Sequence, residues 1–193
     1  YTTKSLEKEP EVLLDPNKLS EDGTVALSGT SVSNDNKYLA YAISRSGSDW
    51  KEIYLKNIET GEKLEDHVEW VKFSGMAWYK DGFYYSRYDE PKDGQELSKA
   101  NTYHKVYYHK IGTSQDEDRL VFEDQEHPRR NFYAGTTDDE QYLYISESES
   151  TSGNALYVKD LEKDADFVKL ADGFDYDYMV VDDVDHKLLV LTN

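Results

Sequence analysis

The stretch Ser33-Asn-Asp-Asn-Lys-Tyr-Leu-Ala-Tyr41 combines a polar turn with an apolar run rich in tyrosine. The same phrase returns as Tyr79-Lys-Asp-Gly-Phe-Tyr-Tyr85, Thr137-Asp-Asp-Glu-Gln-Tyr-Leu-Tyr144 and Asp183-Val-Asp-His-Lys-Leu-Leu-Val190. Aligning the copies on Asn36, Gly82, Glu140 and His186 gives steps of 46, 58 and 46 residues. A repeat of this length is typical of β-propeller blades, which are small antiparallel sheets that bury their faces against neighbouring blades.

A second repeated element lies between the turn phrases and supports the same period. It alternates apolar and polar residues over 52–58, 105–111 and 155–161, and a polar turn follows each copy. A shorter apolar segment comes next in each unit, so a unit contains about four strands. The sequence therefore predicts an all-β fold, a partial β-propeller of about three to four blades, each a four-stranded antiparallel sheet.

The spacing of these elements predicts how one propeller domain over residues 1–193 is divided. We expect a blade remnant at 1–27, a blade at 28–69, a blade at 70–126 with a polar insertion over 89–101, a blade at 127–172 and an incomplete blade at 173–193. A closed propeller hides its sheet edges, whereas an open arc leaves inner faces exposed. The chain by itself is therefore expected to associate through these faces or to be marginally stable.

The composition favours strands and narrows the range of partners. The chain contains 17 Tyr, 3 Trp and 6 Phe, whose flat rings pack well on a pleated sheet. It carries 40 Asp and Glu against 22 Lys and Arg, a formal charge of −18, which repels nucleic acid and anionic membrane surfaces and attracts basic peptides. The absence of Cys excludes disulfides, thiolate metal ligands and a Cys nucleophile, and it leaves a cytoplasmic or a periplasmic location equally open.

Several motifs go beyond a general propeller pattern and occur in a specific order. They are Leu14-Asp-Pro-Asn-Lys-Leu-Ser-Glu-Asp-Gly-Thr-Val-Ala-Leu27, Ser44-Arg-Ser-Gly-Ser-Asp-Trp50, Val71-Lys-Phe-Ser-Gly-Met-Ala-Trp78, Lys105-Val-Tyr-Tyr-His-Lys-Ile-Gly-Thr113 and Asp116-Glu-Asp118. With these motifs the chain, from about Pro10 to Asn193, resembles the N-terminal propeller of the prolyl oligopeptidase family. This resemblance implies part of a seven-bladed propeller that covers an α/β-hydrolase domain, in a serine endopeptidase that cleaves short peptides after proline.

The catalytic residues implied by that family are not found in this sequence. The hydrolase domain would supply a Ser on a strand-to-helix elbow, then Asp and His, but no Gly-x-Ser-x-Gly occurs in the chain. We therefore expect the propeller to act as a lid that gates substrate access, with short proline-containing peptides and the hydrolase domain as partners. The chain alone is expected to be inactive. Two alternatives remain open, a stand-alone propeller scaffold for protein partners and a sister peptidase with another specificity.

The resemblance places four residues of this chain near bound peptide. Phe73 matches the propeller phenylalanine that faces the peptide cavity, although it would equally suit packing between blades. Asn131 stands where relatives often carry an apolar residue, and Ser150 where many carry a cysteine. Arg130 precedes a predicted innermost strand, where its guanidinium would grip a peptide carboxylate or pair with an acidic neighbour.

Histidines and acidic residues offer no clear metal site or cofactor site. The five histidines are single and lack zinc-site spacing, so we interpret them as surface or turn residues; they are His67, His104, His109, His127 and His186. The acidic residues around Gly173 match no EF-hand, which favours a polar loop between blades. No metal ligand, catalytic residue or cofactor is predicted for this chain.

Overall fold

The computed structural model describes residues 1–92, 94, 100–163 and 165–193, and its strands fall into four consecutive groups. The first group contains β1 (Val25–Val32), β2 (Tyr38–Arg45), β3 (Lys51–Asn57) and β4 (Lys63–Val71). The second contains β5 (Ala77–Tyr79), β6 (Gly82–Arg87), β7 (Lys105–Lys110) and β8 (Arg119–Glu123). The third contains β9 (Asn131–Thr136), β10 (Tyr142–Ser148), β11 (Ala155–Asp160) and β12 (Val168–Ala171), and the fourth contains β13 (Tyr178–Val184) and β14 (Lys187–Thr192).

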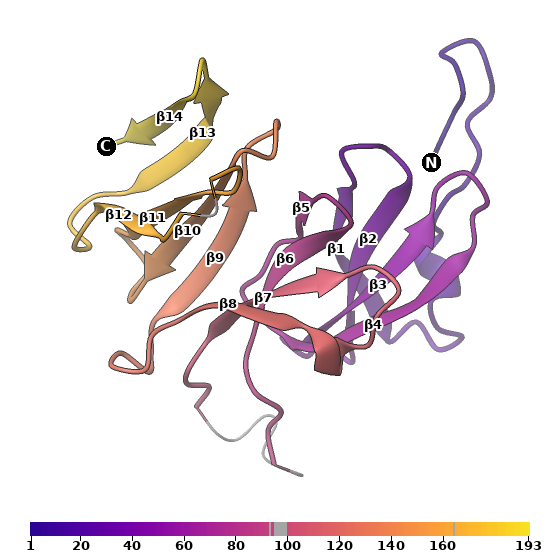
Figure 1. Cartoon of the computed structure of the whole chain (residues 1–193). Coiled ribbons are helices and arrows are strands. Elements are labelled where there is room, and N and C mark those ends of the chain that lie inside the picture. The colour runs from indigo at the N-terminus through magenta and orange to yellow at the C-terminus, as the bar shows by residue number, and fades with distance from the viewer. Residues whose placement is uncertain (93, 95–99, 164) are drawn as a thin grey trace.

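Antiparallel pairing joins the neighbouring strands of each group in chain order. The pair Val71–Arg87 also joins β4 to β6, so the first two groups form one continuous sheet. Two short 3-10 helices, η1 (Pro16–Lys18) and η2 (Gln115–Glu117), lie between strands or before them. Figure 1 shows the groups following one another along an arc, with β1–β4 at one end and β13–β14 at the other. The predicted fold class, an all-β partial propeller, is confirmed.

The insertion predicted over 89–101 is only partly covered by the described residues. Residues 93 and 95–99 of this stretch lie outside them, so the prediction stays untested. At its two ends, Tyr88 follows β6 and His104 precedes β7, and both side chains are buried. The ends of the insertion are therefore packed into the fold.

Two copies of the turn phrase fold in the same way. In the first, the Asp35 carboxylate accepts hydrogen bonds from the Ser33 hydroxyl and the Lys37 backbone N–H, while Asn36 takes a positive φ of 58°. In the third, Asp139 accepts from the Thr137 hydroxyl and the Gln141 backbone N–H, and Glu140 has φ of 63°. An aspartate that bonds the backbone two residues ahead is a common turn device, and here it fixes the register of each hairpin.

The other two copies use shorter turns. Between β13 and β14, Asp185 and His186 both have positive φ, as a type I′ turn requires. Between β5 and β6 the positive φ belongs to Lys80, and Gly82 is already the first residue of β6. A Cβ at Gly82 would lie 2.1 Å from the backbone oxygen of His109. This glycine therefore permits close strand packing rather than the turn itself.

The core lies between successive sheets, which stack face to face. Between the first two groups the core is formed by Ala40, Ala42, Ile53, Leu55, Val68, Val71, Trp78, Phe83 and Tyr85. Between the second and third groups it is formed by Tyr84, Val106, Phe132, Ala134, Leu143 and Ile145. Leu156, Val158 and Val180 connect the third group to the fourth. Because each sheet buries its faces against its neighbours, the loops at the strand ends are free to form sites.

Candidate functional site

Phe73 lies in the loop between β4 and β5, and its side chain is held outward. The residue is 57% exposed, and its ring meets the His104 ring edge-on with centroids 6.5 Å apart. Its backbone has a positive φ of 47°, which is rare for a bulky residue. Of the two interpretations that the sequence allowed, this exposure favours a ring that faces solvent over one packed between sheets.

Phe73 and Asn131 line one cavity of about 430 Å³ at the end of the second and third sheets. Its other lining residues are Tyr88, Asn101, Arg129 and Glu149. Asn131 is the first residue of β9, and its Oδ1 accepts a hydrogen bond from the Tyr88 hydroxyl. The cavity thus offers an exposed aromatic ring, a fixed amide and charged groups, a combination that can hold a peptide side chain next to its backbone.

Arg130 lies beside this cavity, with its guanidinium bound inside the protein. Its Nη1 donates to Glu147 at 3.0 Å and its Nε donates to Glu149 at 3.0 Å. Glu147 is fully buried on β10 and also accepts from the Tyr157 hydroxyl at 3.0 Å. Of the two roles considered for Arg130, these contacts favour pairing with acidic neighbours, an arrangement that joins β10 to the segment before β9.

Ser150 lies just beyond β10, outside the lining of the cavity. It is exposed, and its hydroxyl donates to the backbone oxygen of Ser152 at 3.1 Å. Among the four residues that the resemblance singled out, the described cavity therefore brings Phe73 and Asn131 together. Arg130 and Ser150 stand next to it.

Two histidines that we interpreted from the sequence as surface or turn residues are in fact buried, so that interpretation is wrong for them. His104 is 1% exposed, and His109 has no exposed surface. Burial of His104 lowers its pKa to about 4, although the hydrogen bond to the Lys72 backbone opposes this shift. The imidazole is therefore neutral at physiological pH. Nothing in the local sequence signals this burial, because the partners of each ring come from distant segments.

His109 lies between two carboxylates at the boundary of the first two sheets. Its Nδ1 is 2.7 Å from Asp118 and its Nε2 is 3.1 Å from Asp66. Asp66 also accepts from the backbone N–H of Gly112, and Asp118 from the Tyr85 hydroxyl. Desolvation alone would lower the pKa of His109, but the hydrogen bonds and charges of the two aspartates raise it to about 9. The imidazolium is thus a structural cation inside the core.

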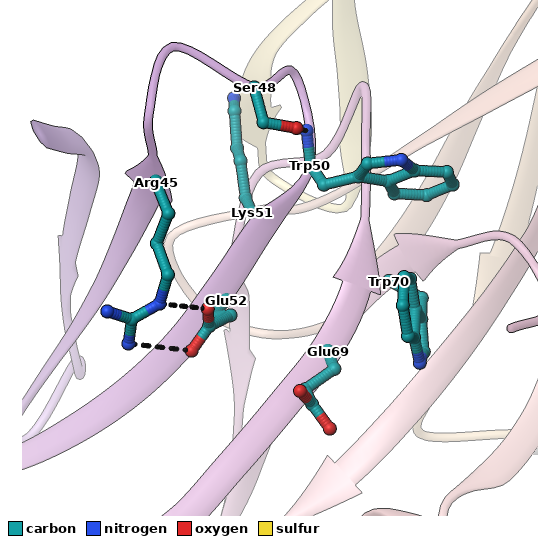
Figure 2. Close-up of a pocket in the computed structure, with 7 residues that line it drawn as sticks. All are labelled: Arg45, Ser48, Trp50, Lys51, Glu52, Glu69 and Trp70. Atoms are coloured by element: carbon teal, nitrogen blue, oxygen red, sulfur yellow. Dashed lines mark hydrogen bonds and ion pairs between the residues drawn. The ribbon is translucent and has the colours of Figure 1, made fainter. Parts of the chain in front are cut away.

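A smaller cavity of about 140 Å³ lies beside the residues that lead to Phe73, and Figure 2 shows its lining. Arg45 donates from Nε and Nη2 to the Glu52 carboxylate, at 2.6 and 3.2 Å. Across the cavity, the Trp50 ring meets the Trp70 ring edge-on with centroids 5.6 Å apart. These contacts pair the charged groups within the chain and pack the residue three positions before Phe73, so this cavity supports the segment at Phe73.

Metal and membrane sites were also sought in the structure. Within the ranges that the structure describes, no group of three or more His, Cys, Asp or Glu is placed to hold a metal ion. No helix among the described residues is long and apolar enough to cross a membrane. The candidate site therefore rests on the cavity at Phe73.

Comparison with known proteins identifies close relatives. The model of the prolyl oligopeptidase N-terminal β-propeller domain matches residues 1–193. A prolyl endopeptidase of Elizabethkingia meningoseptica is 44% identical over 184 residues, which cover 95% of this chain and 26% of that protein. Prolyl oligopeptidase A of Amanita bisporigera is 36% identical, with 95% and 27% covered.

Solved structures agree with these relatives. Prolyl oligopeptidase B of Galerina marginata, bound to a 35mer hydrolysis and macrocyclization substrate, superposes with a TM-score of 0.87 at 32% identity. The superposition covers 95% of this chain and 28% of that one. The chain thus spans about a quarter of the length of the relatives it matches. By its sequence and its fold, the chain belongs to the prolyl oligopeptidase family, as an N-terminal β-propeller domain.

Proposed function

We propose that the chain is the substrate-gating propeller of a serine endopeptidase that cleaves short peptides after proline. In such an enzyme the propeller covers the active site of an α/β-hydrolase domain, keeps out folded proteins and bulk water, and adds contacts remote from the reacting bond. The hydrolase domain performs the acyl transfer with its own Ser, His and Asp. Short proline-containing peptides and this hydrolase domain are the partners of the proposal, and the net charge of −18 favours peptides that carry basic residues.

The cavity on which Phe73 and Asn131 converge carries this proposal. The exposed Phe73 ring provides apolar surface for the peptide side chain next to the proline, and the Asn131 amide provides a polar contact at the same wall. Arg130 keeps the wall in place through Glu147 and Glu149 and meets peptide only where its remaining donor atoms reach. Ser150 enters the proposal as an exposed hydroxyl at the edge of the same surface.

The blade boundaries belong to the same proposal. We take residues 28–69, 70–126 and 127–172 as three blades, because β1–β4, β5–β8 and β9–β12 fall within a few residues of these limits. Residues 173–193, with β13 and β14, then form part of a fourth blade. In this arrangement the cavity at Phe73 lies between the second and third blades.

The proposal is tested with the full-length protein that carries this chain. It should cleave a chromogenic peptide after proline, and the isolated chain should leave the same peptide intact. Phe73→Ala should raise KM for a peptide with a large side chain beside the proline and change kcat little, because the ring contributes binding that ground state and transition state share. Asp49→Asn, at an exposed residue outside the cavity, is the control.

Two results would contradict the proposal. Full-length protein that fails to cleave any proline-containing peptide, yet retains protein partners in a pull-down, would favour the scaffold alternative. A preference for Arg or Ala over Pro would instead indicate a sister peptidase. Either result redirects the function while leaving the propeller fold unaffected.

A further inference from the structure

The segment at residues 70–73 holds a conformation that it does not prefer. Trp70 has φ of 61° and Phe73 has φ of 47°, so two bulky residues within four positions adopt left-handed backbone. Such residues cost of order 1–3 kcal/mol each and persist only where surrounding contacts impose them. The contacts around this segment therefore decide where the Phe73 ring points.

One side of the segment is held by β3 and β6. The Lys72 ammonium lies 4.4 Å above the Trp50 ring, and the Tyr88 backbone N–H donates to the Trp70 backbone oxygen at 3.2 Å. These contacts reach Trp70 and the side chain of Lys72. The backbone next to Phe73 is left to a different partner.

That partner is His104, whose two ring nitrogens both bind backbone. The backbone N–H of Phe132 donates to Nδ1 at 2.9 Å, so Nδ1 must be the acceptor and the ring proton must lie on Nε2. Nε2–H then donates to the Lys72 backbone oxygen, also at 2.9 Å. Lys72 precedes Phe73, and Phe132 follows Asn131. A single imidazole thus joins the residue before Phe73 to the residue after Asn131.

Aromatic contacts reinforce the same connection. The His104 ring lies 4.5 Å from the Tyr88 ring and 6.5 Å from the Phe73 ring, centroid to centroid. Tyr88 in turn donates its hydroxyl to the Asn131 side chain. Burial lowers the pKa of His104 to about 4, which keeps both nitrogens in the roles that this bridge requires.

We propose that His104 is a positioning residue, whose Nε2–H tautomer fixes the Phe73 backbone relative to strand β9 so that Phe73 and Asn131 face peptide as one rigid wall. Its role in peptide binding rests on the proposed function. Its role in fixing the geometry of the two residues does not. The two parts are therefore tested separately.

The geometric part is tested by NMR on the chain with a pair of variants. His104→Asn places an amide oxygen where Nδ1 stood, and so keeps an acceptor for Phe132 while it loses the donor to Lys72. His104→Gln reaches the Nε2 position and does the opposite. We expect the Phe73 signals to shift and broaden in His104→Asn and the Asn131 signals to shift in His104→Gln. His67→Gln, at a half-buried histidine on β4, is the control.

Wild-type protein provides a reading that needs no variant to fold. The ¹⁵N spectrum of the histidines should show one buried ring with the pattern of a neutral Nε2–H tautomer and cross-peaks to Phe132. A proton on Nδ1, or two tautomers in exchange, overturns the proposal. So do His104→Asn and His104→Gln spectra in which Phe73 and Asn131 respond no more than in His67→Gln.

The binding part is tested by kinetics of the full-length peptidase. Each His104 variant should raise KM roughly threefold to tenfold, about the contribution of one hydrogen bond, with little change in kcat. The increase should be largest for peptides with a bulky side chain beside the proline and small for glycine at that place. A role in stability alone would lower Tm without this dependence on the peptide.

The possible failures are distinguishable. If Phe73→Ala leaves KM unchanged, the proposed contact with peptide fails, and the role of His104 in binding fails with it, whatever the spectra show. If Phe73→Ala raises KM but both His104 variants behave like His67→Gln, the positioning role fails and the proposed function stands.

Discussion

The sheets at the two ends of the arc differ in what covers their outer faces. At the first end, Tyr41, Ile43 and Tyr54 of the β1–β4 sheet are buried, and Leu14 and Leu19 of the preceding segment pack against them. At the other end, the β13–β14 hairpin buries one face against the third sheet through Val180. Its opposite face, which we call the bare face, is apolar and more than half exposed and consists of Met179, Leu189 and Leu191.

This difference shows that the stability of a blade depends on its neighbours. Both sheets alternate apolar residues on two faces, so both need two covers. The first sheet receives its second cover from residues of the same chain, whereas the bare face receives none from the described residues. Apolar surface left in water forgoes roughly 25 cal/mol per Å² of stabilisation. A single substitution should therefore have very different effects in the two places.

The largest expected effect is at the interface between the first two sheets. Phe83 is fully buried there, with its ring 5.5 Å from Trp78. Phe83→Ala should lower the free energy of unfolding by about 3–5 kcal/mol, because it leaves a cavity that packed sheets cannot fill. Met179→Ala on the bare face should change it by less than about 0.5 kcal/mol. Denaturant titration of both variants checks this contrast, and equal losses would contradict it.

A smaller effect is expected from pH, and it acts only at the covered interface. The pKa of His109 is about 9 in the fold and 6.5 in the unfolded chain. A raised pKa stabilises the fold fully below pH 6.5, and this contribution is lost as the pH rises through 9. The free energy of unfolding should therefore fall by about 2–3 kcal/mol between these two pH values.

A matched pair of variants isolates this effect. Asp66→Asn removes one of the two charges that raise the pKa of His109, so it should reduce the pH dependence between pH 6.5 and 9. Asp49→Asn, the same substitution at an exposed position, should retain the wild-type dependence. Urea unfolding at several pH values measures both. If both variants follow the wild-type curve, another group carries the dependence and the role assigned to His109 is wrong.

The sequence allowed the strands to be predicted, but not the groups that connect the sheets. Alternating residues around Ile53 and Leu156 mark strands because a sheet has a period of two, which needs no knowledge of distant contacts. The turn at Asp35 is also local, since the side chain bonds backbone two residues away. His104 and His109 were missed because their partners are 28 to 43 residues away. Only the assembled fold brings such groups together.

The candidate site divides in the same way. The motif around Phe73 identified a residue that the structure exposes at a cavity, because the motif reflects a fold that relatives share. Arg130 could not be assigned from the sequence alone. Whether its guanidinium reaches peptide or an acidic neighbour depends on Glu147, which comes 17 residues later on another strand. Sequence order gives no distance between two such charges before the sheet register is known.

The smallest effect on stability, and the sharpest test of the comparison, is expected from the bare face. We expect the chain by itself to self-associate through Met179, Leu189 and Leu191, because two such faces can cover each other. The first end cannot serve in this way, since Leu14 and Leu19 already occupy its face. Association through one face gives dimers, whereas association through both ends would give longer arrays.

Leu191→Gln should therefore shift the chain from dimer to monomer in sedimentation velocity, with a change in the free energy of unfolding of the monomer within about 0.5 kcal/mol. Leu6→Gln, the same substitution at a fully exposed leucine near the other end, should leave the dimer intact. Salt gives an independent check. Because each chain carries a charge of −18, repulsion opposes the dimer, and raising the ionic strength from 0.01 M to 0.15 M shortens the Debye length from about 30 to about 8 Å. Apolar association should thus strengthen with salt, whereas a dimer held by ion pairs would weaken and would place the contact elsewhere.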